Sequence, residues 1–142
     1  MTFPAAQDGG CFCKAIRFRV TGEPKHSVIC HCSSCRRASG APSVAWITFG
    51  RPQVEFLTGE LRRFQSSPGV VRGFCASCGS QISYETANHP GTIDVTTASL
   101  DDPTAFPPTG EVWVQEKLWW EAVNRSLDHY PADVAGGTYA ND

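Results

Sequence analysis

The sequence has little excess charge of either sign and no long apolar run. Its 142 residues include 12 Lys and Arg and 14 Asp and Glu, which gives a formal net charge of -2 at pH 7. Proteins that bind nucleic acid through its phosphates carry a basic excess, so the composition argues against that class. No stretch approaches about 18 consecutive apolar residues, which excludes a membrane-spanning helix.

The start of the chain, MTFPAAQDGG, has neither the basic head nor the apolar run of a secretory signal peptide. We therefore expect a cytoplasmic protein. Thiols stay reduced in that compartment, where clustered cysteines indicate metal binding more often than disulfides. No linker divides residues 1–142, so one domain is expected, with residues 135–142 as a frayed tail.

Helical patterns are scarce, and patterns typical of strands are common. In AIRFRV (15–20) three apolar residues alternate with two arginines, which predicts a strand with one buried face. Further strands are expected at 43–49, 61–65, 70–74, 81–86 and 92–97, separated by Gly and Pro turns. Short helical turns are expected at 33–38 and near 103–106. The fold class predicted is all-β, built of several short sheets with little helix.

Seven cysteines fall into three groups with the short spacings of metal sites. Cys11 and Cys13 form a C-x-C pair, Cys30, Cys32 and Cys35 form C-x-C-x-x-C, and Cys75 and Cys78 form C-x-x-C. Structural zinc takes four protein ligands, and catalytic zinc takes three with one position open. Two pairs plus the triplet therefore give one closed site and one open site. Spacing alone also allows Cys32 and Cys35 to join either pair.

The residues around the triplet suit chemistry. Arg36 and Arg37 follow Cys35 directly, and guanidinium groups near a helix start favour thiolates. The same arginines could bind a substrate carboxylate, or could simply balance the sulfur charge and face water. His31 lies between two cysteines, so on an extended strand its side chain points away from them. We interpret it as packed beside the site rather than as a ligand.

At this point the chain resembles the glutathione-dependent formaldehyde-activating enzyme (GFA) family, whose domain is shared with centromere protein V. The similarity rests on GGCFCKAIRF (9–18), CHCSSCRRASGAP (30–42), FQSSPGVVRGFCASCGSQI (64–82), ASLDDPTAFPP (98–108), Trp113, the Trp119–Trp120 pair and LDHYP (127–131). It covers about residues 8–131.

The resemblance implies short coiled sheets gathered around two zinc ions. It implies a structural zinc held by Cys11, Cys13, Cys75 and Cys78, and a catalytic zinc held by Cys30, Cys32 and Cys35. The family activity is formation of S-hydroxymethylglutathione from formaldehyde and glutathione, classed as a carbon–sulfur lyase in reverse. Small thiols or electrophiles are therefore the partners expected, with glutathione as a co-substrate; the sequence indicates no oligomeric state.

Two positions depart from the family pattern. Lys14 replaces the usual glycine, and Glu111 replaces a histidine found in many members; both are expected near the mouth of the site, where they put the substrate in doubt. Two alternative functions stay open, a zinc-stabilised binding module without catalysis and a zinc enzyme of the same fold with another substrate.

Two sets of residues have no assigned role. The candidates for a general base are known by position only: His31, Tyr84, Glu85 and Asp94. Three tryptophans, Trp113, Trp119 and Trp120, are expected to pack against a β core or its edge, or else to line an apolar pocket beside the metal.

Overall fold

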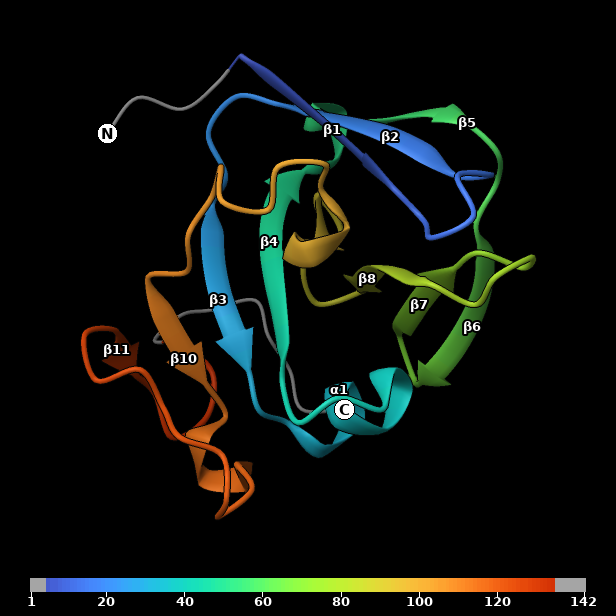
Figure 1. The fold of residues 1–142 in the computed structure, drawn as a ribbon. Coiled ribbons are helices and arrows are strands. Elements are labelled where there is room, and N and C mark those ends of the chain that lie inside the picture. The colour runs from blue at the N-terminus through green and yellow to red at the C-terminus, as the bar shows by residue number, and fades with distance from the viewer. Residues whose placement is uncertain (1–4, 135–142) are drawn as a thin grey trace.

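The computed structural model describes residues 5–134, and it confirms the all-β prediction (Figure 1). The smaller sheet has three strands in the order β1-β2-β5, and the larger has eight in the order β11-β10-β3-β4-β9-β8-β7-β6. The strands are β1 (Ala6–Gly10), β2 (Arg17–Thr21), β3 (His26–Cys30), β4 (Val44–Gly50), β5 (Val54–Thr58), β6 (Arg62–Ser67), β7 (Val70–Phe74), β8 (Gln81–Thr86), β9 (Thr92–Thr96), β10 (Gly110–Val112) and β11 (Asp128–His129).

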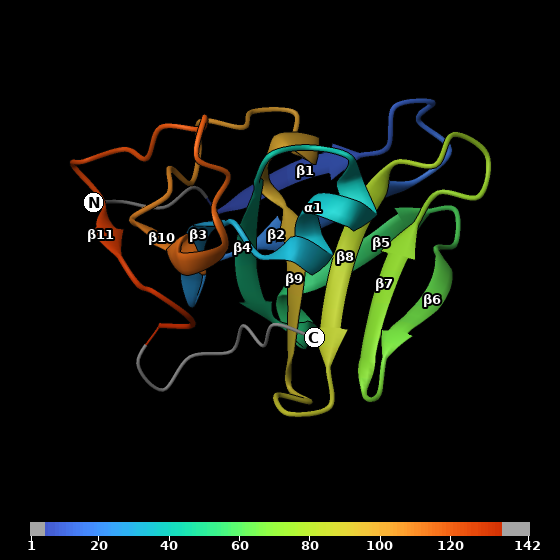
Figure 2. The same ribbon diagram turned by 90° about the horizontal axis from the view of Figure 1, so that it is seen from below.

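Helix is limited to short elements. The α-helix α1 spans Ser33–Ser39, and the 3-10 turns are η1 (Arg51–Gln53), η2 (Thr97–Ser99) and η3 (Val114–Glu116). Figure 2 shows α1 lying over one face of the larger sheet, in front of β4, β9 and β8, while the smaller sheet lies behind. The larger sheet therefore has a different cover on each of its faces.

The face toward the smaller sheet carries the main apolar core. Alternate residues of the central strands, such as Ile47 and Phe49 on β4 and Val95 on β9, are buried there against Phe18 of β2. Period-2 alternation places such residues on one face of the sheet. This core contains Cys11 and Cys75 at its edge.

The opposite face carries a second apolar cluster that surrounds the cysteine triplet. Val28, Trp46, Tyr84 and Val112 pack there with Cys30, Cys32 and Cys35. The strand β10 runs parallel to β3, and pairs Val112 with Cys30. The last part of the described chain thus returns to the segment that carries the triplet.

Several predicted elements are confirmed and others are not. Strands 70–74 and 81–86 have the predicted bounds, and the other predicted strands and α1 differ by a residue or two. The segment 103–106 forms a turn without helix, so that prediction is wrong. The sequence patterns did not predict β1, β3, β5, β10 and β11. The expected tail at 135–142 lies outside the described residues.

Among residues 5–134, no helix has the length and apolar character needed to cross a membrane.

Candidate metal centres

Four cysteines from two distant turns meet at one point. The Sγ atoms of Cys11, Cys13, Cys75 and Cys78 all lie within 4.8 Å of one another. The sulfurs of Cys11 and Cys13 are 3.6 Å apart, and those of Cys13 and Cys75 are 3.8 Å apart. The first pair follows β1 and the second follows β7, so this group joins the smaller sheet to the larger one. Its geometry could hold a metal ion.

Tight turns bring each pair together. Cys11 and Cys13 lie in the turn between β1 and β2. The backbone N–H of Ile16 donates to Cys11 Sγ at 3.2 Å. In the second turn, Gly79 has a φ of 78° and donates from its N–H to the Cys75 carbonyl at 2.8 Å. Glycine adopts this left-handed conformation without steric cost.

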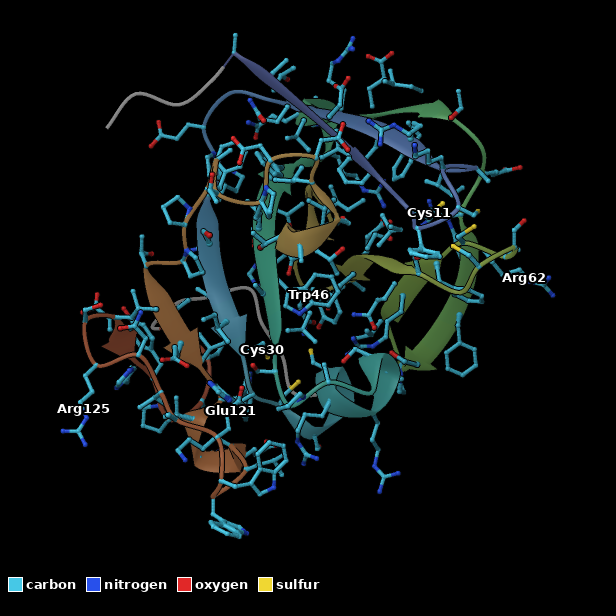
Figure 3. All side chains as sticks on the ribbon, viewed as in Figure 1. Cys11, Cys30, Trp46, Arg62, Glu121 and Arg125 are labelled. Atoms are coloured by element: carbon cyan, nitrogen blue, oxygen red, sulfur yellow. The ribbon has the colours of Figure 1, made fainter. Side chains whose placement is uncertain are left out.

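The triplet forms a separate group at the N-terminus of α1 (Figure 3). Cys30 ends β3, Cys32 is the N-cap residue of α1, and Cys35 lies in its first turn. Their sulfurs also lie within 4.8 Å of one another, and each residue is only 1–4% exposed. Cys32 Sγ accepts a hydrogen bond from the Cys35 N–H at 3.3 Å. The described residues add no histidine, cysteine or carboxylate as a fourth member.

Three crowded thiols cannot all ionise without a compensating cation. Hydrogen bonds with Cys32 and Cys35, together with burial, raise the pKa of Cys30. Hydrogen bonds from the Cys30 and Cys32 thiols lower the pKa of Cys35, and the charge of the Arg72 guanidinium lowers it further. Like charges at this distance disfavour joint ionisation, so a buried divalent cation is the natural way to hold three thiolates.

Arg72 is a site residue that the sequence analysis missed. Its Nη1 and Nη2 atoms donate to Cys35 Sγ at 3.8 and 3.9 Å, and the guanidinium lies 5.1 Å from the centroid of the Tyr84 ring. Sequence reasoning instead placed Arg36 and Arg37 near these sulfurs. The signal for Arg72 was present, because it is the one charged residue in the otherwise apolar strand VVRGF.

Arg72 belongs to a row of side chains that crosses the larger sheet. Register pairs Thr48 of β4 with Asp94 of β9, Asp94 with Tyr84 of β8, and Tyr84 with Arg72 of β7. Directly paired residues project from the same face of a sheet, so all four lie on the face of the triplet. Burial raises the pKa of Asp94 to about 8, against the opposing effect of a hydrogen bond with Thr48.

His31 points away from the sulfurs into a buried cluster of acidic residues. Its Nε2 atom lies 2.6 Å from Glu111 Oε1, and its Nδ1 atom lies 3.4 Å from Glu121 Oε2. Glu111 is only 2% exposed, so the expectation that it lies at a site mouth is wrong. Glu116 accepts a hydrogen bond from the Ser33 N–H at the start of α1, at 2.9 Å. Three carboxylates from residues 111–121 therefore support the loop that carries the triplet.

Two neighbouring cavities flank α1. The first, of about 610 Å³, reaches from α1 to Cys11 and Cys78. The second, of about 580 Å³, is lined by Arg37 and Arg72 at its charged part and by Phe64 and Phe74 at its apolar part. Gln81 lines both cavities. Neither wall includes a cysteine of the triplet, but Arg72 lines the second cavity and also contacts Cys35.

The remaining residues that the sequence singled out lie outside the two cysteine groups. Arg36 and Arg37 both line a smaller cavity of about 240 Å³ with Trp120. Lys14 is exposed in the turn of the four-cysteine group and has a φ of 68°. Glu85 forms ion pairs with Arg51 and Arg63.

The three tryptophans lie in different surroundings. Trp113 packs against the cluster around the triplet, as expected for a residue at the edge of a core. Trp119 is 89% exposed, so the packing expected for it is wrong. Trp120 lines the small cavity beside α1.

The chain is similar to known proteins in both sequence and structure. A family model described as "Glutathione-dependent formaldehyde-activating enzyme" matches residues 6–116. A curated protein of Halomonas elongata, named "Putative glutathione-dependent formaldehyde-activating enzyme", is 27% identical over 133 residues, which cover 85% of this chain and 83% of the relative. A crystal structure of a Rhodobacter sphaeroides protein has a TM-score of 0.56 at 25% identity, and the match covers 67% of this chain and 88% of the other. Because the family model spans well over half of its length, the chain belongs to the glutathione-dependent formaldehyde-activating enzyme family.

Proposed function

We propose that the protein is a zinc-dependent carbon–sulfur lyase of the GFA type, which joins a thiol to formaldehyde or another small electrophile, or runs that reaction in reverse. The observation that carries the proposal is the group of three buried cysteine sulfurs to which the described residues add no fourth ligand. Catalytic zinc sites keep one position for water or substrate, whereas structural sites are closed by four protein ligands. The family and the name of the Halomonas relative support the same reading.

The residues present fit zinc at both groups. Thiolates are soft ligands, and tetrahedral sulfur sites select zinc or iron–sulfur clusters. Cys11, Cys13, Cys75 and Cys78 would close a structural site, and Cys30, Cys32 and Cys35 would hold the catalytic ion. Zinc bound by the triplet would supply Lewis-acid chemistry, which lowers the pKa of a substrate thiol and keeps its sulfur as a nucleophile.

The reaction balances without a redox cofactor. The thiol sulfur attacks the carbonyl carbon, a carbon–sulfur bond forms, and the carbonyl electron pair moves to oxygen, which takes up the proton that the thiol has lost. The chain's own part is to bind and orient the substrate. Arg37 lines the 580 Å³ cavity, where a guanidinium can hold a carboxylate through two hydrogen bonds. Glutathione, which carries two carboxylates, is the first thiol to test.

Cobalt substituted for zinc tests the proposal directly. Titration with glutathione or cysteine is expected to change the visible spectrum through new sulfur ligation, while S-methylglutathione leaves it unchanged. Apparent affinity for the thiol is expected to rise with pH and to level off near its own pKa of about 8.5, because coordination releases the thiol proton. The proposal fails if no thiol changes the spectrum of protein that holds two cobalt ions.

A second candidate is a binding module in which both metals are structural. The burial of the triplet favours it, because all three cysteines are 4% exposed or less and none lines either large cavity. The same titration separates the candidates. The binding module would be supported if no thiol changes the visible spectrum and if the rate of thiol–formaldehyde exchange, followed by NMR, is the same with and without the protein.

A further inference from the structure

A divalent metal ion alone does not neutralise the negative charge of the triplet. Three thiolates and a divalent ion leave a net charge of about -1, and a fourth thiolate makes it about -2. The group lies in an apolar cluster that includes Val28, Trp46 and Val112. An uncompensated charge is costly in such surroundings unless a charged partner and hydrogen bonds accompany it.

Arg72 is placed to relieve this cost. Its residue is 5% exposed, and both terminal nitrogens of its guanidinium face Cys35 Sγ, at 3.8 and 3.9 Å. Two further contacts fix its orientation, with the Tyr84 ring at 5.1 Å and with Ser66 Oγ at 3.3 Å from Nε. Arginine stays charged at every physiological pH, so its positive charge is permanent at this position.

The same side chain forms part of the wall of the 580 Å³ cavity. The guanidinium therefore belongs to the wall of this cavity and also contacts Cys35 Sγ. The cavity is large enough for a small organic thiol, since ligand sites span roughly 300–1,000 Å³. The permanent charge of Arg72 favours an anionic ligand over a neutral one in this cavity.

We propose that Arg72 is a positioning residue that lets the buried triplet site take a fourth, anionic sulfur ligand from the cavity that Arg72 lines. This inference rests on the proposed function. Arg72 acts through its positive charge, which stabilises the triplet site when the negative charge of that site increases. A neutral ligand at the same position gains nothing from this positive charge. Removal of the Arg72 charge is therefore expected to lower the affinity for thiols more than the affinity for neutral donors.

The test uses the two-cobalt protein and two small ligands. The first, 2-mercaptoethanol, becomes charged only at sulfur, and the second, imidazole, is a neutral nitrogen donor. Dissociation constants for both are read from the visible spectrum in wild type, Arg72→Gln, Arg72→Lys and Arg63→Gln. Arg63 is the matched control, because it lies on the adjacent strand β6 and pairs with Glu85, away from the triplet.

Arg72→Gln is expected to lower the ratio of thiol to imidazole affinity at least tenfold, which corresponds to about 1.4 kcal/mol. Arg72→Lys is expected to keep this ratio within about threefold of wild type, because the charge is retained, and Arg63→Gln to leave it unchanged. A purely structural role for Arg72 would weaken both ligands together and leave the ratio unchanged.

Several outcomes overturn the inference. An unchanged ratio in Arg72→Gln does so, and so does a tenfold loss in Arg72→Lys. If Arg72→Gln does not hold two cobalt ions, Arg72→Met, which also removes the charge, replaces it under the same criterion. Absence of any thiol response in wild type would instead sink the proposed function, so the two failures are distinguishable.

Discussion

At the scale of single residues, Lys14 occupies a backbone conformation that favours glycine. Lys14 has a φ of 68° in the turn of the four-cysteine group. An L-residue in the left-handed region carries a steric cost of about 1 kcal/mol, which glycine avoids. A glycine, which the resemblance leads us to expect at this position, would suit this turn, and the lysine is accommodated at some cost in stability.

Lys14→Gly is expected to raise the free energy of unfolding by about 0.5–1 kcal/mol, because relief of strain outweighs the greater freedom of glycine in the unfolded chain. The midpoint of thermal unfolding should rise by about 2–4 °C. Lys25→Gly is the control, since Lys25 is exposed and has no positive φ; its unfolding midpoint should fall. Equal shifts in the two variants would contradict this account.

Asp94 gives the fold a pH dependence of definite sign. Burial raises its pKa from 3.8 to about 8. Below about pH 4 the carboxyl group is protonated in both states and costs nothing. Between about pH 4 and 8 the unfolded chain releases a proton that the folded chain keeps, so stability falls as pH rises, and above pH 8 the loss is complete.

Asp94→Asn replaces the protonated acid by a neutral group of similar shape. The stability difference between this variant and wild type should therefore grow in favour of the variant from pH 6 to 8, and level off above. Comparing variants cancels the protons released by the metal ligands. Asp102→Asn is the control, because a hydrogen bond from Thr104 lowers the pKa of Asp102, which stays ionised over this range. A difference that does not change with pH would refute the prediction.

At the scale of elements, the sequence predicted best where pattern and local geometry agree. Strands 70–74 and 81–86 are rich in β-branched and aromatic residues, and both were found with the predicted bounds. The strand β1 has the sequence AQDGG, which has almost no β propensity; its antiparallel pairing with β2 makes it a strand. The three-residue strand β10 is likewise defined by its partner β3. A strand that is defined by its partner leaves little signal in its own sequence.

In the candidate site too, residues grouped by local spacing could be predicted from the sequence, and residues brought together by the fold could not. Short spacing along the chain groups the cysteines, so sequence reasoning could find both sets of ligands before any fold was known. The role of Arg72 depends on Cys35, which lies 37 residues away. The partner of His31 is Glu111, 80 residues away. Contacts of this range follow from the register of the sheet, which composition and periodicity do not contain.

The two cysteine groups should differ in their effect on stability. Cys75→Ser is expected to abolish cooperative unfolding, because the zinc proposed at this group ties the turn after β1 to the turn after β7, and structural zinc contributes folding energy directly. Cys32→Ser should lower the unfolding midpoint less, since its three ligands lie within six consecutive residues and serine is itself a good N-cap for α1. Equal falls in the midpoint would reject the division into structural and catalytic metals.

At the scale of the whole molecule, the two faces of the larger sheet carry different groups of residues. One face packs against the smaller sheet through the main core, and the other carries α1, the triplet and the polar row from Thr48 to Arg72. Substitutions on the second face can therefore change ligand binding while the main core stays intact.

The holo-protein is expected to contain two zinc ions per chain, measured by elemental analysis against protein concentration from amino-acid analysis. Cys32→Ser should retain one, at the four-cysteine group. A wild-type protein with a single ion would assign zinc to one group alone, and the variant would then show which. A Cys32→Ser protein that still binds two ions would contradict the proposed ligand set.

The parallel pairing of β10 with β3 has a consequence for the order of events during synthesis. The triplet is synthesised early. Glu111 contacts His31, which lies between two of these cysteines, and it follows His31 by 80 residues. The four-cysteine group also waits, because Cys75 follows Cys13 by 62 residues. A nascent chain that has reached only β9 can thus complete the four-cysteine group while its triplet still lacks the carboxylates that hold it in place. Metal delivery to the triplet is therefore expected to be among the last steps of maturation, after the chain has left the ribosome.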